Sequence, residues 1–442
     1  MSGLLKYWRQ SYVMWACGPL GKIDRVLLLA RMAILLFVVA LPFPHNAVWK
    51  NMALLGMLFA AIALFRQHRL LADLRSPLWW ILGVLLGVLC LTAALGSDPL
   101  DSFHELRKHF LPGLLLLLLV PVVFADLRLG RLLLAICAAA FVLRAGMALV
   151  ELVRYLPDLD AGRAEGSSIK GFALDAGFYI PILLGLFLLA GASRWLAVLG
   201  LPLILIVMLL VQSRTPIIAA AIATVLMLVF LRRWRTLATV VVAGLAVVGY
   251  VAVTQPVIAV RLASAFDTQT YRKAFEIANY SKPGDGLSAR TAIWMGVLEI
   301  TATRCWLGYG FGWKKLGRTA VENGYVAKWQ ARKGDPLAEE QAWYFALPSD
   351  KVNPHSLYLQ IYFESGLLGI SAYLLSVGML LWLSGRLAWR SQGDVQIIGA
   401  VVLAYLVDHL ILGFANGLWI GLGPSFVLLG MLETVRRREK TI

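Results

Sequence analysis

The sequence predicts an all-α, polytopic membrane protein with about twelve transmembrane helices and one long segment outside the membrane. Of its 442 residues, 60% are hydrophobic, whereas 45–50% is usual for a soluble domain. The mean hydropathy is +0.76. The apolar residues also form runs of about 20 residues, the length that a helix needs to cross a bilayer. We therefore expect most of the chain to face lipid or other membrane helices.

Twelve apolar runs predict the spans, and short breaks with turn residues or charges separate them. The runs begin near Val26, Ala47, Pro77, Phe110, Arg131, Gly177, Trp195, Thr215, Leu237, Ser356, Val395 and Gly417. The chain is then divided into transmembrane helices over residues 1–254, an extramembrane segment over residues 255–355 and further transmembrane helices over residues 356–442. In the middle segment the apolar residues have helical spacing, which predicts amphipathic helices on a membrane face.

The distribution of Lys and Arg predicts the orientation, because cytoplasmic loops are enriched in both. With the N-terminus inside, the inner loops and termini hold 19 Lys and Arg residues, and the short outer loops hold 6. Both termini are therefore predicted to be cytoplasmic and the long segment external. The net charge of +16 then reflects topology and affinity for anionic membrane lipids. No arginine-rich arm is present, so nucleic acid is not an expected partner.

No metal or other cofactor is predicted. The four cysteines are scattered and have neither the spacing of a disulfide framework nor that of a zinc site. Asp158 and Asp160 form a D-x-D pattern like that of some metal-dependent glycosyltransferases, but three-residue patterns recur by chance. The external segments contain no carboxylate cluster of the kind that holds Mg²⁺.

Two arginines lie at predicted helix starts on the outer side. Arg214 lies in "QSRTPII", where Thr215 and Pro216 resemble a cap and a first helical position. Arg290 lies in "GDGLSARTAIW", in the first turn of a predicted helix. A cation there opposes the helix dipole unless it helps to bind an anion. The alternatives are an anchor at the membrane interface for Arg214 and a solvated surface arginine for Arg290.

His355 lies at a third predicted helix start, in "NPHSLYLQIYFESG", with Asn353 as the cap and Pro354 in the first position. The positive end of a helix disfavours the imidazolium form, and a neutral imidazole is able to accept a proton. The alternative is a structural histidine at a helix cap. Together the three basic groups predict an external anion site beside a base. This suits a phosphate leaving group and a nucleophile that loses a proton.

Several other polar positions have two possible roles. Glu364 follows His355 by nine residues, about half a turn around the helix and ~13 Å deeper, which favours a structural contact between helices over a functional one. Gly310, in "GYGFG", would bring a backbone N–H group to a phosphate or simply form a turn. Arg144 would be a third phosphate contact or part of a buried ion pair. Asp408 and His409, inside an apolar run, are functional candidates because charges are costly in a membrane.

These motifs resemble the signature of the O-antigen ligase and polymerase superfamily. The resemblance is carried, in this order, by "SRTP" at Arg214, "SARTAIW" with Arg290 and Trp294, "LGYGFG", and "PHSLYLQIYFESGLLG" from His355. It covers roughly residues 213–369. It implies a GT-C-like fold and a metal-independent, inverting glycosyltransferase that takes a glycan from undecaprenyl diphosphate at the periplasmic face of the bacterial inner membrane.

The resemblance also implies roles for residues. Arg214 and Arg290 would hold the diphosphate, and His355 would activate the acceptor hydroxyl. The candidate substrate-binding residues are Arg144, Trp294, Gly310 and Glu364. The expected partners are an O-antigen donor linked to undecaprenyl diphosphate, a lipid A core acceptor and membrane lipids.

Three functions remain open. A ligase transfers the glycan to a sugar of the lipid A core, and the length and helix number favour it. A polymerase transfers the glycan to another O-unit on its own lipid carrier. The third possibility is a transporter for the lipid-linked sugar, which would need a cavity through the bilayer and often has internal repeats. The sequence shows no repeat, and its notable polar groups lie at one face.

Overall fold

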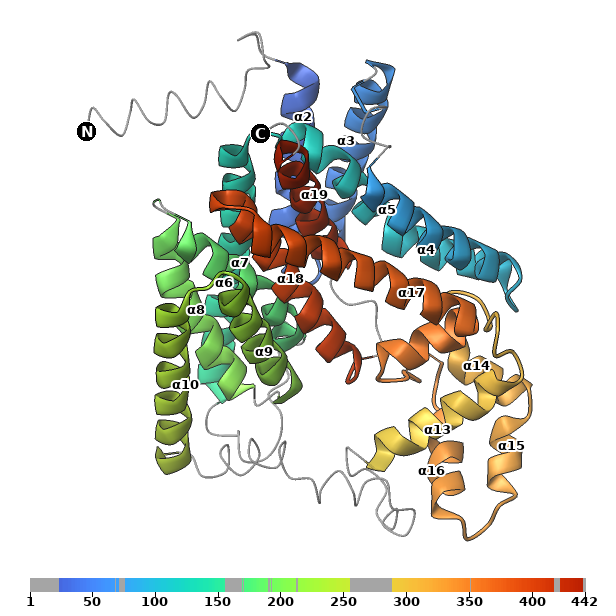
Figure 1. The fold of residues 1–442 in the computed structure, drawn as a ribbon. Coiled ribbons are helices and arrows are strands. Elements are labelled where there is room, and N and C mark those ends of the chain that lie inside the picture. Colours follow the sequence, from blue (N-terminus) through green and yellow to red (C-terminus); the bar gives the residue numbers. More distant parts are fainter. Residues whose placement is uncertain are drawn as a thin grey trace, which may run out of the picture.

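The computed structural model describes residues 24–67, 69–70, 76–155, 169, 171–189, 191, 193–211, 214–254, 288–349, 351–416 and 422–439. Within these ranges every regular element is an α-helix and no strand is present, so the all-α prediction is confirmed. Figure 1 shows two groups of helices: a large bundle, and a smaller group beneath one end of the long helix α17.

The bundle has a helix at each of the predicted spans. Its helices are α2 (Arg25–Ala40), α3 (Ala47–Arg66), α4 (Pro77–Ala94), α5 (Pro99–Val123), α6 (Leu127–Tyr155), α7 (Phe172–Leu188), α8 (Arg194–Leu210), α9 (Arg214–Phe230), α10 (Trp234–Thr254), α17 (Leu357–Arg390), α18 (Gly393–Gly413) and α19 (Leu422–Glu439). By length and composition, 6 of the described helices are able to cross a membrane. The chain is therefore a plausible polytopic membrane protein, and the count of twelve spans stays a prediction.

One continuous apolar core joins the bundle helices. Helix α17 packs on α18 and α4, and α5 packs on α19. Glycines allow the second pair to approach closely, because a Cβ on Gly113 would lie 2.2 Å from Cδ2 of Phe426. Large apolar side chains also remain on the outside, such as Trp80, Leu199 and Val253, which are 72%, 70% and 84% exposed. Lipid would cover such a surface.

Helix α5 begins earlier than the sequence predicts. The stretch "GSDPLDSFHELRKH" was expected to be a loop before a span at Phe110, but α5 starts at Pro99. Asp98 caps the helix by accepting a hydrogen bond from the Asp101 N–H at 3.2 Å. Ser102, Leu106 and Phe110 are buried, and their four-residue spacing forms one apolar face. The charged residues are therefore on the opposite face of a helix.

The smaller group consists of α13 (Ser288–Ala302), α14 (Lys315–Glu322), α15 (Tyr325–Gln330) and α16 (Pro336–Phe345), which we call the cap. The cap has a core of its own. Its largest fully buried side chains include Trp329 and Phe345. The described part of the predicted extramembrane segment is therefore helical, as expected, but its helices pack on one another. Whether the cap lies on a membrane face stays a prediction.

A break in α17 joins the cap to the bundle. Gly366 has φ 62° and ψ −161°, a combination open essentially only to glycine. The carbonyl groups of Phe363 and Glu364 accept from the N–H groups of Tyr309 and Gly310, at 2.8 and 2.9 Å. Beyond the break, the Leu367 and Leu368 N–H groups donate to the Cys305 and Trp306 carbonyls, at 2.7 and 3.2 Å. The loop after α13 thus replaces two bonds of the helical ladder, those that the Leu367 and Leu368 N–H groups would donate to the Phe363 and Glu364 carbonyls.

Candidate active site

Helix α13 directs two of the predicted site residues towards the His355 turn. The helix begins at Ser288, so Arg290 lies in its first turn, as predicted. Trp294 follows four residues later, and positions i and i+4 share one face of a helix. Its indole Nε1–H donates to the Pro354 carbonyl at 3.1 Å. The substrate contact predicted for Trp294 stays a prediction, while this hydrogen bond ties α13 to the turn that carries His355.

The structure corrects the predicted start of the helix after His355. Helix α17 begins at Leu357, and its cap is Ser356, whose Oγ accepts from the Leu359 N–H at 3.5 Å. Asn353 caps a turn instead: its Oδ1 accepts from the His355 N–H at 2.8 Å. His355 therefore lies just before the helix, and its φ is 50°. This left-handed conformation is uncommon for residues other than glycine, and surrounding contacts must hold it.

Helix α16 supplies part of that support. The Tyr344 hydroxyl donates to the Asn353 carbonyl at 2.7 Å and accepts from the Asn353 N–H at 2.9 Å. One turn earlier on the same helix, Gln341 Nε2 donates to the Ala292 carbonyl in the first part of α13 at 3.2 Å. Helix α16 therefore braces both sides of the site: the helix that carries Arg290 and the turn that carries His355.

His355 is held in its neutral form. Its partial burial, and to a lesser extent the positive charge of Arg290, lower the pKa of the imidazole from 6.5 to about 4. The sequence attributed the neutral form to the helix dipole alone; the structure assigns it to burial and to Arg290. At neutral pH the imidazole therefore has a nitrogen lone pair free of a proton, as a general base requires. The effect of Arg290 also shows that the two residues are close.

Arg214 is the first residue of α9, so the prediction that it lies at a helix start is confirmed. Its side chain lies outside the part of the chain that the structure describes. Asp158 and Asp160 lie outside the described residues as well. Among the described residues, no three His, Cys, Asp or Glu side chains gather as a possible metal site.

Arg144 forms the ion pair that the sequence left as one of two alternatives. It lies on α6 and is 3% exposed, and its guanidinium contacts the carboxylate of Asp175 on α7. The Arg144 Cζ also lies 5.6 Å from the centre of the Phe172 ring. A contact with a donor phosphate is not tested and stays a prediction.

Gly310 and Glu364, two predicted substrate-binding residues, contact each other beside the break in α17. Gly310 has φ 94°, and the N–H group that was predicted to bind phosphate donates to the Glu364 carbonyl. The Glu364 side chain is fully buried, and its Oε1 accepts from Gln360 Nε2 at 2.9 Å. These contacts agree with the structural alternatives of the sequence analysis. A substrate-binding role for either residue stays a prediction.

Asp408 lies within the bundle on α18 and is 1% exposed. Its Oδ1 accepts no hydrogen bond within the described residues. The ring centre of His409 lies 5.9 Å from that of Tyr405. None of these interactions connects Asp408 or His409 to the turn that carries His355. The two residues are therefore not included in the candidate active site.

Tyr344 and Gln341 were not predicted from the sequence as residues of the site. Both precede His355 within "QAWYFALPSDKVNPHS", in a short helix that was not predicted separately. The Asn353-x-His355 spacing was a usable signal, because an Asn side chain often accepts a hydrogen bond from the backbone two residues later. The contact of Tyr344 with Asn353 depends on tertiary packing, which no local pattern encodes.

Comparison with known families identifies the segment that contains this site. The family model described as O-antigen ligase matches residues 195–374. The match extends from α8 to the first part of α17 and includes Arg214, Arg290 and His355. The match supports membership of the chain in the O-antigen ligase and polymerase superfamily, as the sequence motifs indicated. This membership supports a membrane-bound, glycosyltransferase-like activity of the ligase or polymerase type. No curated protein matches the chain.

Proposed function

We propose that the protein is an O-antigen ligase. It transfers an O-antigen glycan from undecaprenyl diphosphate to a sugar of the lipid A core, at the periplasmic face of the bacterial inner membrane. The observation that carries the proposal is a neutral His355 beside Arg290, held in a strained turn within the segment that matches the family. Strained backbone is typical of sites where a side chain must be positioned for chemistry.

The proposed reaction is a single displacement with inversion at the anomeric carbon. The acceptor hydroxyl oxygen attacks that carbon, and His355 takes the hydroxyl proton. The bond from the anomeric carbon to the diphosphate oxygen breaks, and the electron pair remains on the departing undecaprenyl diphosphate. Arg290 and Arg214 stabilise the charge that develops there. Arginine suits this task because its guanidinium always remains charged and presents several N–H donors.

Donor binding would also strengthen the base. In the free protein the charge of Arg290 contributes to the low pKa of His355. A bound diphosphate carries negative charge and would offset that contribution, so the pKa of His355 would rise towards its ordinary value. A base of higher pKa accepts a proton more readily. The acceptor would then be activated most strongly when the donor is in place, which would limit wasteful proton transfer.

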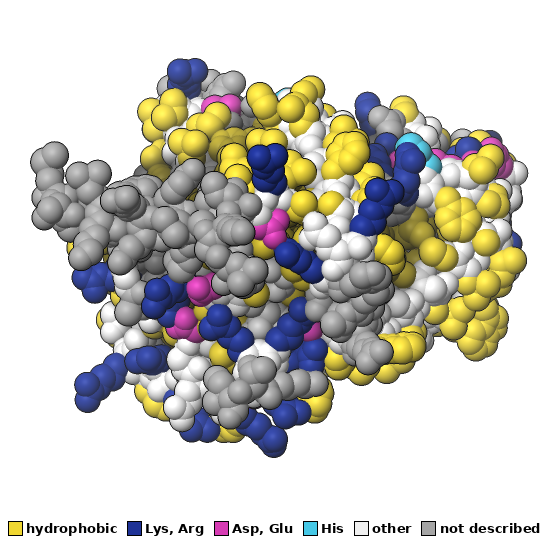
Figure 2. All heavy atoms as spheres, turned by 90° about the horizontal axis from the view of Figure 1, so that it is seen from above, with side chains coloured by type: hydrophobic (Ala, Val, Ile, Leu, Met, Phe, Trp, Pro, Cys, Tyr) yellow, Lys and Arg dark blue, Asp and Glu magenta, His cyan; other side chains and the backbone are white. Residues whose placement is uncertain are grey.

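The distribution of charge supports the proposed orientation. Figure 2 shows Lys and Arg side chains spread over the face seen from above, the face where α19 ends in Figure 1. Three arginines, Arg436, Arg437 and Arg438, occupy the last turn of that helix. By the positive-inside rule this face would be cytoplasmic. Both termini would then be cytoplasmic, and the cap with His355 would be in the periplasm.

The direct test is glycan transfer by the purified protein with a defined lipid-linked donor and a lipid A core acceptor. We expect His355→Ala to lower the rate by about 10²–10⁴-fold, the usual contribution of a general base. Arg290→Ala should lower it by about 10²–10³-fold, as does loss of a group that stabilises charge in the transition state. Exposed His104 and Arg107 on α5 provide matched controls, and alanine there should leave the rate unchanged. Normal transfer by His355→Ala would disprove the role of the base.

Metal independence is part of the same proposal and has its own test. Transfer should continue at an unchanged rate when EDTA is added and should not rise when Mg²⁺ or Mn²⁺ is restored. A requirement for a divalent cation would overturn the mechanism. It would also return attention to Asp158 and Asp160.

Polymerase activity is the related alternative, because the matched family supports either type. Deletion of the gene distinguishes them in cells. Loss of a ligase leaves long O-antigen polymers attached to the lipid carrier and no O-antigen on the core. Loss of a polymerase leaves single O-units attached to the core.

A further inference from the structure

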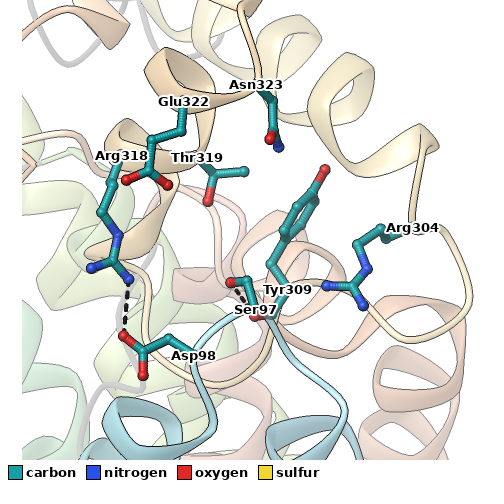
Figure 3. Close-up of a pocket in the computed structure, with 8 residues that line it drawn as sticks. All are labelled: Ser97, Asp98, Arg304, Tyr309, Arg318, Thr319, Glu322 and Asn323. Atoms are coloured by element: carbon teal, nitrogen blue, oxygen red, sulfur yellow. Dashed lines mark hydrogen bonds and ion pairs between the residues drawn. The ribbon is translucent and has the colours of Figure 1, made fainter.

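A polar pocket distinct from the His355 site lies between the cap and the start of α5 (Figure 3). Its volume is about 480 Å³, within the range of small-molecule binding sites. Figure 3 shows that its side chains come from three segments: the turn before α5, the loop after α13, and α14 with the residue that follows it. Neither His355 nor Arg290 lines it. The pocket therefore needs an explanation of its own.

One wall of the pocket is a face of α14 whose polar side chains have no hydrogen-bond partner among the described residues. Thr319, Glu322 and Asn323 line it, and their spacing of three and four residues places them on the same side of the helix. None of the three side chains forms a hydrogen bond or ion pair with another described residue. Figure 3 shows the three side chains directed into the same hollow. They provide a hydroxyl, a carboxylate and an amide.

Two arginines border the hollow from opposite sides in Figure 3, and both are held in position. Arg318 Nη2 lies 3.2 Å from Oδ2 of Asp98. Arg304 Nη2 donates to the Leu95 carbonyl at 3.1 Å, and its Cζ lies 5.5 Å from the centre of the Tyr309 ring. Such anchoring fixes the remaining N–H donors before any ligand arrives, which lowers the entropic cost of binding.

The charges that line the pocket do not favour an anionic ligand. Arg304 and Arg318 are balanced by Asp98 and Glu322, so the formal charge of the lining is zero. A phosphate would meet the free carboxylate of Glu322. A sugar hydroxyl both donates and accepts hydrogen bonds, and so matches a carboxylate, an amide and a guanidinium that face one space. We propose that this pocket binds sugar rings of a glycan at positions remote from the reacting bond.

The pocket is rigidly connected to the helix that follows His355, and here the inference builds on the proposed glycosyl transfer. The Tyr309 carbonyl accepts from the Ser97 N–H at 3.0 Å, and the Tyr309 N–H donates to the Phe363 carbonyl at 2.8 Å. The rings of Tyr309 and Phe363 also stack, with their centres 5.3 Å apart. Phe363 lies six residues after the start of α17, roughly 9 Å along its axis. A glycan that reacts at His355 would then need only a short extension to reach the pocket.

Binding of soluble, lipid-free oligosaccharides to the whole protein in detergent tests the proposal without requiring transfer. The probes are core oligosaccharide and O-antigen polysaccharide, released by mild acid from lipopolysaccharide of the source bacterium, with ligand-observed NMR as the readout. We expect at least one probe to bind, and Glu322→Gln with Asn323→Ala to weaken it by about tenfold, as expected for two lost hydrogen bonds. Gln330→Ala, an exposed amide on α15, is the control and should bind normally.

The possible results distinguish an acceptor glycan from a donor glycan. They also distinguish failure of the sugar-binding proposal from failure of the proposed function. Binding of the core oligosaccharide alone would assign the pocket to the acceptor, and binding of the O-antigen alone to the donor. Failure of both probes to bind, equal binding by the double variant, or displacement of the sugar by inorganic diphosphate would overturn the sugar-binding proposal. A wild-type protein that binds sugar but transfers none would instead refute the proposed function and leave the pocket assigned.

Discussion

The bundle and the cap use their polar side chains in different ways. In the bundle, Glu433 is 1% exposed and accepts hydrogen bonds from Ser76, Arg436 and Arg437 at 2.6 to 2.9 Å. In the cap, the side chains of Glu322 and Asn323 line a pocket and have no hydrogen-bond or ion-pair partner among the described residues, and the neutral His355 is held at the edge of the cap. Buried charges must be paired, whereas groups that bind a substrate must remain available to it. The difference separates paired, structural charges inside the bundle from accessible polar groups at the cap, which the proposed chemistry would use together with Arg214 at the start of α9.

The largest effect is expected where the two regions are joined. In Gly366→Ala the new Cβ would lie 2.3 Å from the backbone carbon of Trp306, in a conformation that strongly disfavours side chains. The cap would have to separate from α17, at a cost of about 3 kcal/mol or more. We expect little folded protein, as measured by thermal melting in detergent. A folded and fully active variant would show that the cap does not depend on this join.

The control for Gly366→Ala lies on the same helix. A Cβ on Gly378 would meet nothing within 4 Å, and the residue is helical. Gly378→Ala should therefore leave the melting temperature unchanged or raise it slightly, because alanine favours the helix.

The next effect tests whether charge in the bundle is structural. Asp175→Asn removes the carboxylate that pairs with Arg144, which is 3% exposed. Because the Asp175 side chain is itself 40% exposed, we expect a loss of about 2–3 kcal/mol, less than for a fully buried pair. Chemical unfolding of the purified protein measures it. Arg144→Met combined with Asp175→Leu should restore most of the stability.

The same double variant decides between the two roles of Arg144. If the pair is structural only, the restored protein should transfer glycan with an unchanged KM for the lipid-linked donor. A stable double variant with a raised KM for that donor would show that Arg144 also contacts the phosphates. A buried charge of the bundle would then join Arg214 in the proposed chemistry, and the contrast with the cap would be weaker.

Local sequence patterns predicted the helices and the candidate residues better than they predicted the joins. Apolar runs located the bundle helices because membrane helices need long apolar segments. The start of α17 was placed three residues too early, because Asn353 and Ser356 are both good caps and no local rule separates them. The contacts of Tyr344 with Asn353 and of Trp294 with Pro354 hold both residues in the turn, so that the helix starts after Ser356. The break at Gly366 depends on a loop that is distant in sequence, so it could not be predicted.

A smaller effect should appear in the pH dependence at the edge of the cap. The pKa of His355 is about 4, below its usual 6.5, through burial first and Arg290 second. The imidazole must be neutral to act as a base, so the acid limb of kcat/KM should lie near pH 4 in the free protein. In Arg290→Gln the pKa should rise but remain below 6.5, because burial persists. The acid limb of the kcat/KM profile should therefore move to higher pH in this variant, even if its maximal rate is lower.

The pH profiles of both proteins, measured in parallel with a NMR titration of His355, test this expectation. Since the folded protein disfavours the protonated imidazole, the same group should lower stability as the pH falls from about 6.5 towards 4. That loss should be smaller in Arg290→Gln. An acid limb that stays in place after the substitution would show that Arg290 does not act on His355.

The smallest effect is expected for the hydrogen bond between α13 and the His355 turn. Trp294→Phe keeps most of the aromatic packing but removes the donor to the Pro354 carbonyl. One such bond contributes about 0.5–1.5 kcal/mol, so kcat should fall by roughly twofold to tenfold while the melting temperature changes little. Trp343→Phe on α16 is the matched control, since that side chain is 57% exposed. If Trp294→Phe instead raised only the KM for one substrate, Trp294 would be a binding residue as the sequence suggested, and the turn would not depend on it.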